Sequence, residues 1–286
     1  MTPSPMDDPK TLVSTSWLAA HLADPDLRVL DASWYLPAQN RDAKADYAAG
    51  HIPGARFFDI DEIADLTGPL PHMAAPVEKF TSRVRALGIG DGQQVVVYDG
   101  AGIFSAARVW WNFRLMGLTA VAVLDGGLPK WRAEARAVTA APPDLRAPHL
   151  TPHHQPQLVK SAAQVLEASQ TGTAVIIDAR SSARFKGEAA EARAGLRGGH
   201  IPGSVNVPFG AVLNPDGTML EPPQLRAVFE AAGVDLSRPA ITTCGSGVTA
   251  AVLSLALERL GHRDHALYDG SWSEWGGRED LAVEKG

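Results

Sequence analysis

Cys244, the only cysteine among the 286 residues, is the side chain best suited to nucleophilic chemistry. It follows the apolar run Ala240–Thr243 and opens the segment CGSGVT, and small and apolar residues then recur at helical spacing from Thr249 through Leu260. A cysteine between a strand end and a helix start meets unpaired N–H groups and the positive end of the helix dipole, which favour the thiolate. A lone cysteine can also be an inert, buried side chain, so the rest of the chain must decide between the two roles.

The elements that would position this cysteine belong to the second copy of an internal sequence repeat. Three motifs recur in the same order, 144 to 149 residues apart, which argues for an internal repeat. His51-Ile52-Pro53-Gly54 returns as His200-Ile201-Pro202-Gly203, Val29-Leu30-Asp31-Ala32 as Ile176-Ile177-Asp178-Ala179, and Leu124-Asp125-Gly126 as Tyr268-Asp269-Gly270.

Each repeat alternates short β-branched runs with helical patterns. This alternation predicts an α/β fold, with a parallel sheet covered by helices on both faces in each half. We expect one domain over residues 1–140 and a second over 158–286, joined by an extended, proline-rich linker over 141–157. The predicted strands include Val29–Asp31, Val95–Tyr98, Val121–Leu124, Val175–Asp178 and Ala240–Thr243.

Asp99 occupies the place of Cys244 in the first repeat. Gly88 precedes Asp99 by eleven residues and Gly233 precedes Cys244 by eleven, and each site ends an apolar run and is followed by Gly and small residues. An aspartate cannot carry sulfur, so we expect the first domain to be catalytically silent and the second to hold the chemistry.

Composition narrows the function further. The formal net charge is −6 and there is no long Lys/Arg run, so nucleic acid is not expected as a partner. No run of 18 apolar residues predicts a membrane span, and the polar start lacks the pattern of a signal peptide, so we expect a cytoplasmic protein. One cysteine leaves no CxxC pair, and no metal or organic cofactor is implied.

Together, the two HIPG motifs, the Asp in the first loop and CGSGVTA in the second resemble the tandem-domain rhodanese sulfurtransferases, over residues 13–275. Within this family the loop is most similar to that of the 3-mercaptopyruvate sulfurtransferases. The resemblance implies two rhodanese-like domains and a mobile sulfur carried as a persulfide of Cys244. The donor would be mercaptopyruvate, and the acceptor a thiol such as that of thioredoxin, or cyanide.

The resemblance also implies roles for particular residues. Gly245, Gly247, Val248 and Thr249 would curl their amides around the sulfur and the bound donor. Arg184 and Arg193, nine residues apart before His200, match the substrate-binding arginines, and guanidinium groups suit a planar carboxylate. Surface arginines that pair with Glu188 or Glu191 are the alternative. Ser246 would donate a proton through His72 and Asp61 of the first half, as a relay between domains.

Three rival functions remain to be weighed. A thiosulfate sulfurtransferase would reward cations within the loop, where this chain has Gly245-Ser246. A phosphatase needs an arginine about six residues after the cysteine, and Ala250 stands there, which excludes it. A non-enzymatic persulfide carrier would have little use for two arginines and a relay. We expect a monomer, and the tail over residues 276–286 has no predicted role.

Overall fold

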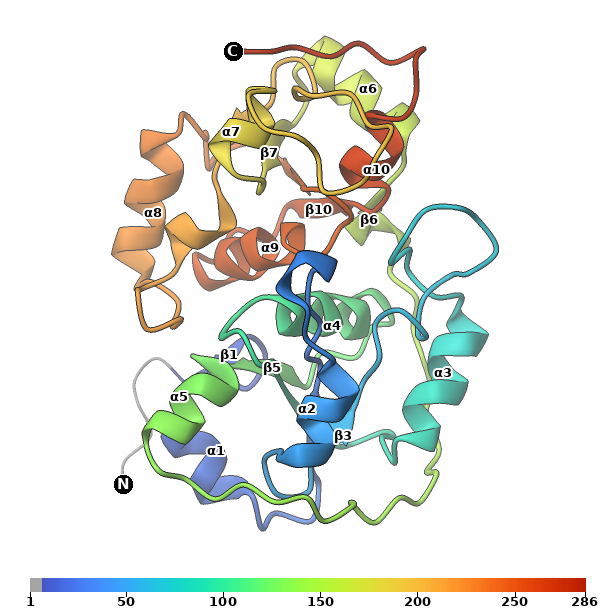
Figure 1. Ribbon diagram of the computed structural model, residues 1–286, viewed down its shortest axis with the longest axis vertical. Coiled ribbons are helices and arrows are strands. Elements are labelled where there is room, and N and C mark those ends of the chain that lie inside the picture. Colours follow the sequence, from blue (N-terminus) through green and yellow to red (C-terminus); the bar gives the residue numbers. More distant parts are fainter. Residues whose placement is uncertain (1–6) are drawn as a thin grey trace. The chain divides into compact units, whose positions relative to one another are not determined.

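The computed structural model of the chain describes residues 7–286 and divides into two compact units (Figure 1). Unit 1 contains residues up to Ala64, Ala75–His154 and Pro215–Met219. Unit 2 contains Asp65–Ala74, Gln155–Asn214 and Leu220–Gly286. Each unit therefore corresponds to one repeat, with one short segment contributed by the other repeat. The prediction of two continuous domains over 1–140 and 158–286 did not include this exchange.

Unit 1 is built on a parallel sheet with the strand order β1-β5-β4-β2-β3. Its strands are β1 (Leu12–Val13), β2 (Leu27–Asp31), β3 (Arg56–Phe57), β4 (Gln94–Tyr98) and β5 (Val121–Leu124). Its helices are α1 (Thr15–His21), α2 (Ala43–Ala49), α3 (Val77–Ala86), α4 (Ser105–Leu115) and α5 (Gly127–Ala133), with a 3-10 turn at Pro37–Gln39.

Unit 2 repeats this topology as β6-β10-β9-β7-β8, again with parallel pairs. Its strands are β6 (Val159–Lys160), β7 (Val175–Asp178), β8 (Val205–Asn206), β9 (Ala240–Thr243) and β10 (His265–Tyr268). Its helices are α6 (Ala162–Thr171), α7 (Ser182–Phe185), α8 (Pro222–Ala231), α9 (Ala250–Arg259) and α10 (Ser271–Trp275), with 3-10 turns at Pro156–Leu158 and Phe209–Val212. The predicted α/β fold with two equivalent parallel sheets is confirmed.

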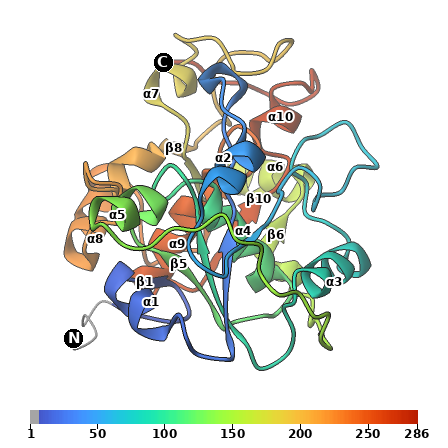
Figure 2. The same cartoon turned by 60° about the horizontal axis from the view of Figure 1, so that its bottom comes forward.

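Helices cover the central strands (Figure 2), whose residues are buried on both faces of the sheet. In unit 2, Ile241 of β9 belongs to one cluster with Val165 of α6 and Trp275 of α10. Its neighbour Thr242 points to the opposite face, where its hydroxyl lies 2.9 Å from that of Ser254 on α9. Alternate side chains of one strand thus fix helices on opposite sides.

The proline-rich segment over residues 141–155 has no helix or strand, as its composition predicts. Its second half is nevertheless held to unit 1. The His149 carbonyl accepts the Asp91 N–H at 2.9 Å, and the His153 N–H donates to the Met116 carbonyl at 2.8 Å. Leu150 between them is buried.

The C-terminal tail also has a structural place. Leu281 is buried, and the Trp275 indole donates to the Ala282 carbonyl at 2.8 Å. Glu284 and His200 exchange both backbone hydrogen bonds, at 2.9 and 3.0 Å. The tail is therefore a strap across unit 2, a role that its acidic composition did not predict. No helix within residues 7–286 combines the length and apolar character needed to cross a bilayer.

Candidate active site

Cys244 follows β9 directly and is buried, with 2% of its surface exposed. The start of α10 holds its backbone on both sides. The Cys244 N–H donates to the Ser271 hydroxyl at 3.2 Å, and the Cys244 carbonyl accepts from the Trp272 N–H at 2.9 Å. One residue further, the Gly245 carbonyl accepts from the Ser273 N–H at 2.8 Å. The loop that carries the thiol is thus fixed before any ligand binds.

Beyond Cys244 the loop turns into α9 (Ala250–Arg259). Gly247 has φ +77°, a left-handed conformation that glycine adopts without steric cost. In the described part of the chain, the N–H groups of Gly245, Ser246, Val248 and Thr249 donate to no protein group. These four donors lie in the residues just after the thiol, ahead of the N-terminus of α9, so the loop can receive an anion there.

The equivalent loop of unit 1 has a carboxyl group in place of the thiol. Asp99 follows β4 as Cys244 follows β9. Its carboxylate accepts hydrogen bonds from the N–H groups of Ala101, Phe104 and Ala106, at 2.8, 2.8 and 2.9 Å. Burial raises the pKa of Asp99, and these N–H donors oppose that rise. Two loops of the same design therefore differ in the residue that follows the strand, a carboxyl group bound by loop N–H donors in unit 1 and Cys244 in unit 2.

Ser246 and His72 are brought together, as the relay requires. His72 belongs to the segment of the first repeat that is part of unit 2. Its Nδ1 lies 3.0 Å from the Ser246 hydroxyl, and both side chains are buried. This contact joins residues 174 positions apart in the sequence. It gives the hydroxyl beside the thiol a buried partner that can exchange a proton.

Asp61, the third predicted member of the relay, lies in unit 1. There its Oδ2 accepts a hydrogen bond from the Trp34 indole at 2.9 Å. The part of Asp61 in proton transfer stays a prediction.

Arg184 lies at the end of α7 with its guanidinium against the cysteine loop. A Cβ added at Gly245 would stand 3.1 Å from Arg184 Nη2, so the guanidinium lies close to the backbone of the loop. The guanidinium also donates from Nε, at 3.1 Å, and from Nη2 to one oxygen of Glu191. The local pairing considered as an alternative role is therefore present, and it leaves the arginine at the loop. Arg193 is half-buried in the irregular segment before His200.

Glu191 is a residue of this site that sequence analysis did not single out. Only 2% of its side chain is exposed, and its other oxygen accepts from Arg180 at 2.8 Å. Arg180 in turn forms a buried ion pair with Asp178 at 2.6 Å, and its guanidinium lies 4.1 Å from the centre of the Trp272 ring. A chain of alternating charges thus runs from the end of β7 to Arg184. The repeated Asp at strand ends was a signal for its first member, but Glu191 has no periodic pattern.

The histidines of the two HIPG motifs make equivalent contacts with backbone carbonyls, which supports a structural role for both. His51 Nδ1 bonds the Tyr47 carbonyl at 2.9 Å, and His200 Nδ1 bonds the Phe185 carbonyl at 2.9 Å. Each histidine also pairs by its backbone with a later strap of its own unit, at Thr139 and Glu284 respectively.

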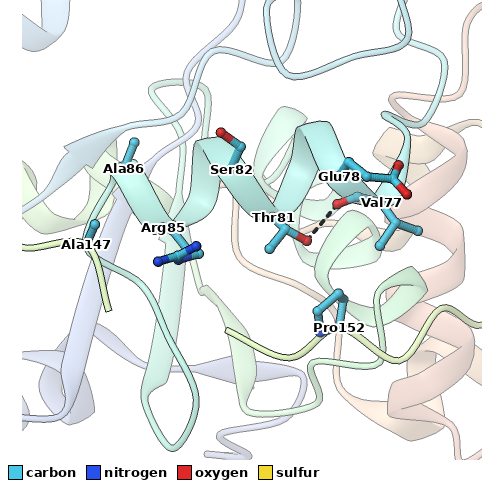
Figure 3. Close-up of a pocket in the computed structure, with 8 residues that line it drawn as sticks. All are labelled: Val77, Glu78, Thr81, Ser82, Arg85, Ala86, Ala147 and Pro152. Carbon is cyan, nitrogen blue, oxygen red and sulfur yellow. Dashed lines mark hydrogen bonds between the residues drawn. The ribbon is translucent and has the colours of Figure 1, made fainter. Parts of the chain in front are cut away.

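A further hollow of about 520 Å³ lies in unit 1 between α3 and the linker, and Figure 3 shows the residues that line it. None of the predicted site residues lines it. Within residues 7–286, no group of three or more His, Cys, Asp or Glu side chains is arranged to hold a metal ion.

Comparison with known proteins agrees with this architecture. The rhodanese-like domain family matches the chain twice, over residues 14–134 and 161–278. The 3-mercaptopyruvate sulfurtransferase of Escherichia coli strain K12 is 43% identical over 273 residues, which cover 95% of this chain and 97% of that protein. A thiosulfate sulfurtransferase of Rattus norvegicus is 45% identical over 273 residues, covering 93% and 92%. The crystal structure of SseA from Escherichia coli, a 3-mercaptopyruvate sulfotransferase, superposes with a TM-score of 0.84 at 41% identity, covering 92% of this chain and 99% of that one.

Proposed function

Because this chain belongs to the tandem-domain rhodanese sulfurtransferases, we propose that it moves the sulfur of 3-mercaptopyruvate to a thiol or cyanide acceptor through a persulfide of Cys244. The observation that carries this proposal is the 3.0 Å hydrogen bond between the buried His72 and Ser246. Ser246 stands two residues after Cys244 in the sequence. A departing enolate needs a proton, and the hydrogen bond between Ser246 and His72 supports this pair as its source.

The first half-reaction follows from the loop and its neighbours. The Cys244 thiolate attacks the sulfur of mercaptopyruvate, and a sulfur–sulfur bond forms as the carbon–sulfur bond breaks. The electron pair of the broken bond passes to the pyruvate enolate, and Ser246, relayed through His72 and Asp61, protonates its carbon. The amides of Gly245, Gly247, Val248 and Thr249 would hold the anionic outer sulfur.

Arg184 and Arg193 would hold the donor itself. Arg184 supports this role by its position against Gly245, because a carboxylate bound there would lie beside the thiol. In the second half-reaction the thiolate of the acceptor, or cyanide, attacks the outer sulfur and Cys244 leaves as the thiolate. No second cysteine can resolve the persulfide internally, so the acceptor is a separate molecule such as thioredoxin.

Intact mass spectrometry tests the proposal directly. We expect incubation with 3-mercaptopyruvate to add one sulfur atom to the protein and to release pyruvate. The addition should map to Cys244 and be absent from Cys244→Ser. Sulfur on another residue, or an unchanged mass with fresh donor, would refute the proposal. Saturation kinetics with a catalytic excess of donor would distinguish an enzyme from a stoichiometric persulfide carrier.

Thiosulfate sulfurtransfer is the second candidate, because a relative of that name is 45% identical to the chain. The same thiolate would serve, but the loop offers Gly245 and Ser246 to a dianionic donor and no cation. We expect kcat/KM to be higher with mercaptopyruvate than with thiosulfate. Arg184→Ala and Arg193→Ala should raise KM for mercaptopyruvate by roughly tenfold or more, since each loses a charged hydrogen bond, and should affect thiosulfate less. The reverse preference would favour the second candidate.

The domain roles and the setting belong to the same proposal. The first rhodanese-like domain, over residues 1–140, would be silent because Asp99 replaces the thiol, and the domain over 158–286 would be catalytic. We also propose that the enzyme is cytoplasmic, since a catalytic thiol needs partners that keep it reduced, and that it is a monomer. Cell fractionation and light scattering of the purified protein test these two points.

A further inference from the structure

Two aspartates at equivalent places in the repeats make the same unusual contact. Asp269 follows β10 and Asp125 follows β5. Asp269 Oδ2 accepts a hydrogen bond from the Ala74 N–H at 2.7 Å, and Asp125 Oδ1 accepts one from the Met219 N–H at 2.8 Å. Each carboxylate therefore holds a segment that comes from the other repeat, 195 and 94 residues away in the sequence.

The segment held by Asp269 is the one that carries His72. Ala74 stands two residues after His72, and the Asp65 N–H closes the base of the segment on the Met73 carbonyl at 2.8 Å. Among the described residues of the segment, His72 alone is a non-glycine residue in the left-handed region, with φ +60°. That conformation costs a side-chain-bearing residue about 1–2 kcal/mol, so it persists only where surrounding contacts enforce it.

Asp269 is 5% exposed, so its bond to the Ala74 N–H is shielded from water. A charge-assisted hydrogen bond of 2.7 Å in such a place is a strong restraint on the backbone. Ala74 is only two residues from His72, whose imidazole contacts Ser246. Losing this bond would let His72 relax from its strained conformation and leave Ser246.

We infer that Asp269 is a positioning residue, which holds the backbone beside His72 and so keeps the imidazole against Ser246 for proton transfer. The inference rests on the proposed function. Asp125 has the same contact on the segment over Pro215–Met219, which carries none of the predicted site residues. The same hydrogen bond therefore occurs in both repeats. The copy made by Asp269 would support the reaction, and the copy made by Asp125 would support only the structure.

This symmetry provides a matched control. We expect Asp269→Ala to lower kcat with mercaptopyruvate roughly tenfold or more, approaching His72→Ala, since general acid–base catalysis contributes about 10²–10⁴. Asp125→Ala removes the same kind of bond and should keep kcat within about twofold. The Cys244 thiol should remain alkylatable in every variant. Asp269→Asn keeps an oxygen acceptor for the Ala74 N–H and should restore most of the lost turnover.

A double-mutant cycle shows whether Asp269 acts through His72. In the His72→Ala background, adding Asp269→Ala should cause no further loss of kcat, because the imidazole it positions is already gone. Additive losses, or a fall in Asp125→Ala equal to that in Asp269→Ala, would mean a purely structural role. Unfolding midpoints of the single variants separate stability from catalysis.

The outcomes also separate this inference from the proposed function. Normal turnover in His72→Ala would remove the relay, and the inference with it, while leaving persulfide formation on Cys244 in place. Impaired His72→Ala with normal Asp269→Ala would overturn the inference alone. Should Asp269→Ala fail to fold, the Asn variant carries the test: turnover as low in Asp269→Asn as in His72→Ala, with an unchanged unfolding midpoint, would contradict positioning by this hydrogen bond.

Discussion

Glu191 is the residue on which the charges around the site converge. It is buried, and its two oxygens accept from Arg180 and Arg184 separately. Removing the charge of this buried carboxylate leaves Arg184 without its carboxylate partner and leaves Arg180 paired with Asp178 alone. Such a loss typically costs about 3–5 kcal/mol when one partner of a buried pair is deleted.

We therefore expect Glu191→Gln to lower the free energy of unfolding by about 3 kcal/mol, as measured by urea denaturation. The control is Glu188→Gln, an exposed carboxylate in the same irregular segment, which should change stability by less than about 0.5 kcal/mol. Equal stability of the two variants would show that the buried charge chain contributes little.

Asp31 stands at the end of β2, where the second repeat has Asp178, but it has no arginine at the equivalent of Arg180. Asp178, its equivalent in the second repeat, is paired with Arg180, whereas Ser33 stands at that place in the first. Burial raises the pKa of Asp31 above 3.8, and hydrogen bonds from Ser33 only partly oppose the rise. The folded state thus holds the proton more tightly than the unfolded state does.

The pH dependence follows from this sign. The contribution of Asp31 to stability is complete below about pH 3.8 and is lost as the pH rises through the folded-state pKa. Asp31→Asn removes this titration and keeps an oxygen acceptor for the Ser33 N–H. We expect urea unfolding of the variant to show a gain in stability, relative to the natural protein, that grows from pH 4 to pH 7. A difference that is constant with pH would contradict the raised pKa.

At the scale of elements, the segment that follows α5 and reaches Thr139 is the counterpart, in the first repeat, of the C-terminal strap that follows α10. We call both segments straps. The Trp131 indole donates to the Ala137 carbonyl as the Trp275 indole does to Ala282, both at 2.8 Å. Each strap then pairs with the histidine of its HIPG motif. The tail is thus a structural part of unit 2.

Truncation after Ala282 tests the strap. It removes the two backbone bonds between Glu284 and His200, each worth about 1 kcal/mol. We expect the truncated protein to lose about 2 kcal/mol of unfolding free energy. Glu284→Ala retains both backbone bonds and should lose less. If the two variants proved equally stable, the backbone pairing would contribute nothing.

The elements that bear the site could be predicted because their signals are local. The apolar run Ala240–Thr243 and the periodicity that follows gave β9 and α9, and the repeat gave the topology of the second sheet from that of the first. The exchanged segments could not be predicted, because a side chain such as Asp269 meets a backbone N–H 195 residues away without any compositional trace. The strap escaped for a related reason, since backbone hydrogen bonds leave no side-chain pattern.

The family resemblance and the residues contributed differently to the site. Arg184, His72 and Ser246 came from matching motifs, and their placement against one loop is a property of the fold. Glu191 was considered only as a competitor for the arginines. Its burial between two of them gives it a place in the site that spacing alone does not define.

At the scale of the whole molecule, each repeat completes the unit built on the other. Unit 2 contains Asp65–Ala74, which brings His72, and unit 1 contains Pro215–Met219. The segment Asp65–Ala74 is held in unit 2 by its own contacts, including the hydrogen bond from Ala74 to Asp269. The contact of His72 with Ser246 therefore does not depend on the covalent linker. Cutting the linker should therefore leave turnover intact.

The linker offers a place to cut. Leu145 is 47% exposed and the side chain of Arg146 is 90% exposed, so a protease site inserted between them is accessible. We expect the cleaved enzyme to keep its kcat with mercaptopyruvate. After separation in urea, the refolded C-terminal fragment should lack His72 and turn over slowly. Returning the N-terminal fragment should restore the rate, whereas an N-terminal fragment with His72→Ala should not. Full activity of the C-terminal fragment alone would show that unit 2 needs nothing from the first repeat.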